Sequence, residues 1–189
     1  MPARTARTVT DTLQPRNLLL AGLPMLGWSA AGAPGAAWGL FTAVFTGLLP
    51  AWFIAHGVRR GSWTDRHIAD RHQRTAVFLV ILAGSAVALA TLRLGHAPRE
   101  LLAAAGCLLA VTVTLLAVTP LWKISVHAMV AGALAAMLLH TLGPTGWPAP
   151  VLAAAVTWSR VTLGDHTRAQ ALAGAATGAA LALLAFAPL

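Results

Sequence analysis

Long apolar runs separated by short polar stretches make up most of this chain. Most of the runs come close to the roughly 20 residues that a helix needs to cross the hydrocarbon core of a bilayer. The pattern therefore predicts an all-α protein, a polytopic transmembrane helical bundle with about six to seven membrane segments. The expected helices cover residues 18–31, 37–56, 75–94, 101–119, 127–142, 150–158 with the turn that follows, and 169–187.

Composition agrees with a membrane protein. The chain has 189 residues, of which 58% are hydrophobic and only 10% are charged, whereas a soluble domain carries about 25% charged residues. No polar stretch is long enough for a second fold, so we expect one transmembrane domain over residues 18–189 after a basic N-terminal tail over residues 1–17. The single cysteine, Cys107, lies in an apolar run. Alone it forms no internal disulfide and no cysteine-based metal site, and we expect it to pack.

The positive charges are unevenly placed along the chain. If the seven spans alternate in direction, the tail and the connections 57–74, 120–126 and 159–168 share one side of the membrane. Of the 13 Lys and Arg residues, all except Arg93 and Arg99 fall on that side. The positive-inside rule makes it the cytoplasmic face of a cell membrane. In such a protein a net charge of +8 points to orientation and anionic ligands, and no nucleic-acid partner is expected.

Three polar stretches meet on this predicted face: "RRGSWTDRHIADRHQR" (59–74), "PLWKISVH" (120–127) and "WSRVTLGDHTRAQ" (158–170). Surplus positive charge in a partly dehydrated pocket favours an anion, and the forked guanidinium of arginine suits phosphate oxygens. A solvated basic loop beside anionic headgroups is the simpler interpretation for part of the first stretch. It does not account for the ionisable residues at the ends of spans, where charge is costly and usually marks a site. These are Lys123, His127, Arg160 and His166.

Spacing refines the third stretch. If a helix starts near His166, then His166, Gln170, Gly174 and Gly178 share one stripe at intervals of four residues. Gln170 would then hydrogen-bond one ring nitrogen of His166 and leave the other exposed, as an activated histidine nucleophile requires. The two glycines would let another helix pack closely.

The third stretch resembles a motif of the type 2 phosphatidic acid phosphatase superfamily, the membrane lipid phosphatases related to vanadium haloperoxidases. That motif reads Ser-Arg, five residues, His, three residues, Asp. Ser159, Arg160 and His166 have this spacing, with Gln170 in the place of the Asp. A resemblance of this kind implies a helical membrane phosphatase whose histidine is the nucleophile.

The two other motifs of the family are matched less closely. "ISVH" is similar to the family's PSGH and keeps Ser125 and His127. The first motif, a Lys and an Arg-Pro, is replaced by "DRHIADRHQR", with Arg74 in the Arg position and Thr75 where Pro would stand. Lys123 would supply the missing lysine charge. Possible auxiliary residues are Arg71, Asp70 and Ser159.

The resemblance implies a mechanism without a metal or other cofactor. His166 would attack phosphorus and form a phosphohistidine, while His127 would protonate the leaving alkoxide and then activate water. The charged phosphoryl oxygens would be held by Arg74, Lys123, Ser125 and Arg160. The substrate class implied is a lipid or isoprenyl phosphate, as a phosphomonoester or diphosphate. The sequence does not distinguish one such lipid from another, and it carries no signal for oligomeric state.

Gln170 is the main departure from the family pattern. An Asp in that place orients the ring and stabilises the imidazolium, whereas Gln can only orient it. Asp70 is a possible substitute, and Asp165 would project from a different face because it directly precedes His166. The expectation is a slow phosphatase or a scaffold adapted to related chemistry.

Two alternatives stay open at this point. "TDRHIADR" is similar to the aspartate-rich motifs of intramembrane prenyltransferases of the UbiA type and of terpene synthases, in which carboxylates hold Mg²⁺ against a diphosphate. Asp65, Asp70 and Asp165 would be the ligands, although the chain is short and has only five acidic residues. The other alternative is a non-catalytic binder or transporter of lipid phosphates on the same scaffold.

Overall fold

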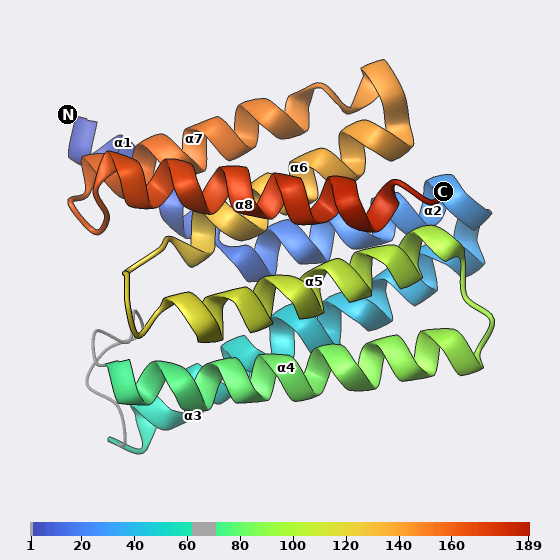
Figure 1. The fold of residues 1–189 in the computed structure, drawn as a ribbon, viewed down its shortest axis with the longest axis horizontal. Coiled ribbons are helices and arrows are strands. Elements are labelled where there is room, and N and C mark those ends of the chain that lie inside the picture. Colours follow the sequence, from blue (N-terminus) through green and yellow to red (C-terminus); the bar gives the residue numbers. More distant parts are fainter. Residues whose placement is uncertain (1, 62–70) are drawn as a thin grey trace.

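The computed structural model of this chain describes residues 2–61 and 71–189, with residues 71–74 described by their backbone alone. Every element in these ranges is helical, so the predicted fold class is confirmed (Figure 1). The helices are α1 Pro2–Thr12, α2 Pro15–Ala43, α3 Leu49–Arg59, α4 Arg71–Leu94, α5 Arg99–Val118, α6 Val126–Leu142, α7 Pro148–Thr162 and α8 Arg168–Phe186. A π-helical turn, Val44–Leu48, joins α2 to α3, and a 3₁₀ turn, Gly143–Gly146, joins α6 to α7.

Helix α2 contains a sharp reversal, and its two arms form a hairpin. Ala31 (φ −150°, ψ 25°) and Gly32 (φ 62°, ψ −143°) leave the helical region. Gly32 adopts a left-handed φ that L side chains rarely take. Beyond the turn, Gly35 approaches the backbone of Gly27 so closely that a Cβ atom on either would overlap the other's carbonyl oxygen. The sequence predicted separate helices over residues 18–31 and 37–56, and this break between them is confirmed.

Successive helices run back and forth along the long axis of the molecule (Figure 1). One end carries α1, the start of α4, the α5–α6 connection and the α7–α8 connection. The opposite end carries the α2 reversal, the α4–α5 and α6–α7 connections, and the C-terminus. The polar stretches 120–127 and 158–170 therefore lie at one end of the bundle, as the sequence predicted.

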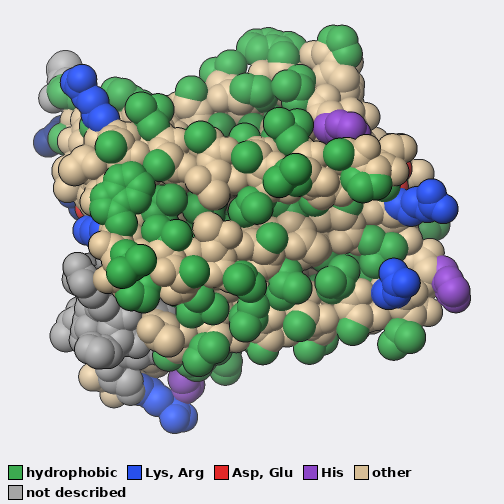
Figure 2. Space-filling model, viewed as in Figure 1, with side chains coloured by type: hydrophobic (Ala, Val, Ile, Leu, Met, Phe, Trp, Pro, Cys, Tyr) green, Lys and Arg blue, Asp and Glu red, His purple; other side chains and the backbone are tan. Residues whose placement is uncertain are grey.

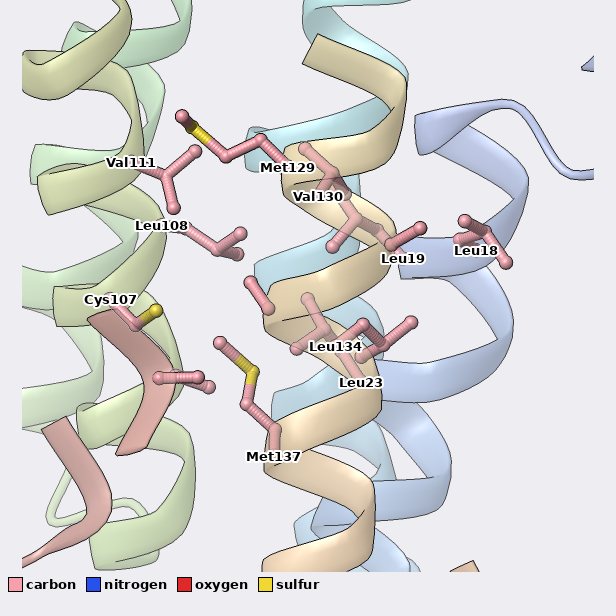
Figure 3. Packing of buried hydrophobic residues seen from close by; sticks show 14 of the residues in the cluster. Leu18, Leu19, Leu23, Cys107, Leu108, Val111, Met129, Val130, Leu134 and Met137 are labelled. Carbon is pink, nitrogen blue, oxygen red and sulfur yellow. The ribbon is translucent and has the colours of Figure 1, made fainter. Parts of the chain in front are cut away.

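Helix α6 is the centre of the core. It packs against α8, α7, α2 and α5, and residues 128–135 are all buried. Figure 3 shows its side chains between two neighbours, with Met129 and Met137 toward α5 and Leu134 beside Leu23 of α2. Cys107 of α5 is buried in the same cluster, as predicted. A helix that is apolar all round is expected to be enclosed by others, and α6 meets that expectation.

Glycines allow α8 to approach α6 at backbone distance. A Cβ added to Gly178 would overlap the carbonyl oxygen of Met129, and one added to Gly174 would lie 2.7 Å from the carbonyl oxygen of Ser125. On the facing helix, Gly132 has the same relation to Ala175. Small residues commonly allow such close approach between membrane helices. The predicted role of Gly174 and Gly178 is confirmed.

The described helices have the length and hydropathy of membrane spans. Five runs qualify by these measures: Pro15–Arg59, Thr75–Leu94, Arg99–Val118, Val126–Gly146 and Arg168–Phe186. The first of them reverses within α2 and therefore provides two passes. Helix α7, with 15 residues, is shorter than a typical span. On the face drawn in Figure 2, cationic and histidine side chains lie toward the two ends and hydrophobic side chains cover the middle. The protein is an integral membrane protein.

The residues expected to form a basic tail contain a short helix, α1, which packs against α7. Its buried face consists of Ala6 and Thr10, one turn apart. Arg4 and Arg7 are exposed. Because only two small residues are buried, the hydropathy of this segment gave no sign of a helix.

Candidate functional site

The Ser-Arg and His of the third polar stretch are brought together by a tight loop. Ser159 and Arg160 lie in the last turn of α7 and are buried. The chain then reverses at Gly164, whose φ of 73° suits glycine. The backbone N–H of His166 donates to the carbonyl oxygen of Arg160 at 3.3 Å. This bond places the histidine directly over the end of α7.

Arg160 is a buried cation with spare hydrogen-bond donors. The residue is only 4% exposed, and its Nη2 atom forms an ion pair with Asp165 at 2.8 Å. Its Nε and Nη1 atoms have no hydrogen-bond partner among the described residues. Unpaired donors on a buried charge are costly, so this arrangement favours an anion that accepts from them. Asp165 forms its ion pair with Arg160 and lies off the stripe of α8. This agrees with the expectation that it projects from a different face than His166.

The ring of His166 is held by a backbone carbonyl. Its Nδ1 atom lies 3.1 Å from the carbonyl oxygen of Lys123. A carbonyl oxygen only accepts, so Nδ1 carries the proton and Nε2 keeps its lone pair in the neutral ring. Burial lowers the pKa of His166 below its ordinary value of 6.5, and the nearby charges of Arg160 and Lys123 lower it further. The hydrogen bond to Lys123 and the charge of Asp165 act in the opposite direction.

Gln170 does not orient the ring, which differs from the expectation drawn from the stripe. Helix α8 begins at Arg168, so His166 precedes the helix, and Thr167 is its N-cap residue. The Gln170 side chain accepts from the Thr167 backbone N–H at 3.0 Å, and the Thr167 hydroxyl accepts from the Gln170 N–H at 3.2 Å. This reciprocal pair is a capping box. The capping box uses the Gln170 side-chain oxygen, and the Lys123 carbonyl contacts the ring instead.

The second polar stretch joins the third through Ser125. This residue is fully buried and caps α6, where its hydroxyl oxygen accepts from the Ala128 N–H at 3.4 Å. Its own N–H donates to the carbonyl oxygen of Gln170 at 3.4 Å. The amide is thereby occupied, and the hydroxyl hydrogen is the group that Ser125 has to offer a ligand. His127 lies half-buried in the first turn of α6, and Lys123 is exposed.

The segment that contains both motifs also matches a family model. Residues 118–187, from the last residue of α5 to the residue that follows α8, match the PAP2 superfamily. The predicted resemblance to type 2 phosphatidic acid phosphatases is confirmed. The searches of curated proteins and of solved structures found no match. The PAP2 match supports a phosphatase activity in general, and it leaves out the first polar stretch.

The residues proposed for the first PAP2 motif are only partly described. Arg71 and Arg74 lie in the first turn of α4, at the same end of the bundle as the other two motifs (Figure 1). Asp70, the suggested auxiliary residue, and Asp65 lie outside the described residues. Within the described ranges, no group of three or more His, Cys, Asp or Glu side chains has the arrangement of a metal site.

Helix α1 is a neighbour of the PAP2 motifs that the sequence did not reveal. The hydroxyl of Ser159 donates to the carbonyl oxygen of Val156, so Thr10 is the donor in the 2.9 Å hydrogen bond between Thr10 and Ser159. A polar cavity of about 190 Å³ lies between α1 and the end of α7. Its lining includes Arg7, Asp11 and Arg160. Helix α1 and the buried Arg160 thus line the same cavity.

Proposed function

We propose that this protein is a membrane phosphatase that hydrolyses a phosphomonoester or diphosphate of a lipid or isoprenoid, with His166 as nucleophile and without a metal. The observation that carries the proposal is the hydrogen bond from the ring Nδ1 of His166 to the Lys123 carbonyl. It leaves Nε2 with an unshared electron pair, and burial keeps the ring neutral at neutral pH.

In the first step, Nε2 of His166 attacks phosphorus and forms an N–P bond while the P–O bond to the lipid breaks. The leaving alkoxide takes a proton from His127. In the second step, water attacks phosphorus and gives a proton to His127, and the N–P bond breaks to release phosphate. The phosphohistidine ring is cationic. Its Nδ1–H would donate to the Lys123 carbonyl oxygen, which takes the place of the carboxylate in the family pattern.

The phosphoryl oxygens need donors that are already in place when charge develops on them. The two unpaired guanidinium nitrogens of Arg160 support this role. The Ser125 hydroxyl at the start of α6 and the exposed Lys123 are the other proposed donors in the described chain, and Arg74 would add a further charge from α4. Gln170 would act on the site only by fixing the start of α8.

We also propose that the site faces the cytoplasm, because the motif-bearing end of the bundle carries nearly all the positive charges of the sequence. The substrate would then enter from the inner leaflet, with its phosphate at the level of the connections between helices.

The direct test is phosphate release from a panel of lipid phosphates and isoprenyl phosphates, with and without a chelator. We expect His166→Ala to reduce release by at least about 10³-fold, as loss of a nucleophile does in other hydrolases. His140→Ala is the matched control, because His140 is an exposed histidine at the opposite end of α6. We expect the control and the chelator to leave the rate unchanged.

The same panel separates the two alternatives. Loss of activity with chelator and its return with Mg²⁺ would favour the prenyltransferase-like interpretation and contradict the proposal. Saturable binding of a lipid phosphate without any phosphate release would favour a non-catalytic binder. Unchanged turnover in His166→Ala would rule out the assigned nucleophile.

A further inference from the structure

A second cavity, which none of the motif residues lines, lies between α7 and α8 and against α6. Its volume is about 840 Å³, within the range of small-molecule sites. Its floor includes Gly132, Ala135 and Ala136 of α6, and Ala154 and Ala176 line its two sides. We call this cavity the α7–α8 groove. It exists because α8 lies at backbone distance from α6 while small side chains line the space beside α7.

Two of the helices that form the groove, α6 and α8, have the length and hydropathy of membrane spans. Apolar walls left empty lose their dispersion contacts, and unfilled space of this size is unfavourable. Water is a poor filler, because almost all of the lining consists of apolar side chains. A hydrocarbon chain is therefore the natural occupant.

One end of the groove is cationic. Arg168 is the only charged residue among those that line it. It is exposed, and it is the first residue of α8. The first turn of α8 contains no acidic residue, so the partial positive charge of the helix N-terminus adds to that of Arg168. Trp158, which also lines the groove, is 44% exposed. Apolar walls with a cation at one end complement an anionic amphiphile.

The groove is separate from the proposed phosphate site. None of the residues assigned to that site lines it. The carbonyl oxygen of Gln170 accepts from the Ser125 N–H. Gln170 and Arg168 are two residues apart, so they lie on opposite sides of α8. Arg160 faces Asp165 and the cavity beside α1. A lipid in the groove would therefore be a bound neighbour of the site and not its substrate.

We propose that the α7–α8 groove binds one bilayer lipid with an anionic headgroup, its acyl chain lying over the small residues of α6 and its headgroup on Arg168. The proposal does not depend on the phosphatase activity, because the lipid is bound and not converted.

The test is native mass spectrometry of the full chain in detergent with phosphatidylglycerol or phosphatidylcholine added. We expect one retained phosphatidylglycerol and much weaker retention of phosphatidylcholine. Arg168→Gln should weaken phosphatidylglycerol retention about fivefold, the contribution of one cation near an anionic lipid. Arg93→Gln, an exposed arginine at the other end of the bundle, should have no effect.

Two further variants test where the acyl chain of the lipid lies. Ala176→Phe fills the groove and should abolish retention, whereas Ala180→Phe, one turn further on α8 and outside the lining, should not.

Equal retention of both lipids, or retention unaffected by Arg168→Gln, would overturn the headgroup assignment. A lipid lost with Lys123→Gln but kept with Arg168→Gln would belong to the phosphate site. A dimer that Ala176→Phe dissociates would make the groove an interface between copies. Each of these results would overturn the proposal.

Discussion

The Nδ1 atom of His166 lies 3.1 Å from the backbone carbonyl oxygen of Lys123, a residue 43 positions earlier in the chain. The orientation of the ring therefore depends on the docking of the α5–α6 connection against the α7–α8 connection. A backbone carbonyl supplies the hydrogen-bond acceptor that a side chain supplies in the family pattern. The nearby Gln170 contributes by capping α8.

Replacing Gln170 by Ala should therefore affect stability more than catalysis. The variant loses the acceptor for the Thr167 N–H, and loss of a capping interaction costs about 1 kcal/mol. We expect less than about a tenfold fall in kcat, compared with about 10⁴-fold when the partner of a catalytic histidine is changed. Thermal unfolding in detergent and phosphate release measure the two effects.

Gln170→Glu is the matched control, since a carboxylate at this position also completes a capping box. It should unfold at the same temperature as the unchanged protein. A loss of activity in Gln170→Ala of several hundredfold, with stability unchanged, would mean that Gln170 orients the ring after all.

The pH dependence of kcat/KM should report the lowered pKa of His166. The proposed attack by His166 requires a neutral ring, so activity should fall as the pH drops through this pKa. Because burial moves the pKa below 6.5, the acid limb should have its midpoint below 6.5. Asp165→Asn removes a charge that raises the pKa, so its midpoint should lie at still lower pH. A midpoint above 6.5, or a shift upward in Asp165→Asn, would contradict this assignment.

The sequence was sufficient to predict the parts of the fold that depend on local patterns. The turn at Gly32 follows from Gly and Pro between two apolar runs, and the packing of Gly174 and Gly178 follows from their spacing of four residues on a helix. The ionisable side chains at the motif-bearing end of the bundle could be predicted as candidate site residues, because charged residues are rare in an apolar chain. Arg160 is the clearest example.

Other features depend on tertiary contacts that leave no mark on the sequence. The partner of His166 is a main-chain oxygen, which every residue possesses, so no side-chain pattern identifies Lys123. Helix α1 is fixed by the contact between Thr10 and Ser159, 149 positions apart. The predicted role of Gln170 required a helix that begins near His166. Because α8 begins at Arg168, Gln170 is part of its capping box instead.

The contact between α1 and α7 should be measurable as a coupling between Thr10 and Ser159. Thr10 is the donor, so Thr10→Val leaves the buried Ser159 oxygen without that bond at a cost of about 1 kcal/mol. Thr10→Ser keeps the donor and should restore most of the stability. A double-mutant cycle with Ser159→Ala isolates the pair. Strictly additive effects of the two substitutions would show that the bond does not contribute.

The close approach of α6 and α8 makes Gly178 intolerant of any side chain. A Cβ at this position would meet the carbonyl oxygen of Met129 and lie 3.0 Å from the N atom of Ala133. Both are backbone atoms, so relief of the overlap requires the two central helices to separate, and overpacking of this kind costs about 1–3 kcal/mol.

Gly106→Ala is the matched control on α5, because a Cβ there has no atom within 4 Å. We expect a lower unfolding temperature in detergent for Gly178→Ala and an unchanged or slightly higher one for Gly106→Ala, since alanine is favoured over glycine within helices. Equal shifts in the two variants would mean that α6 and α8 do not pack at backbone distance.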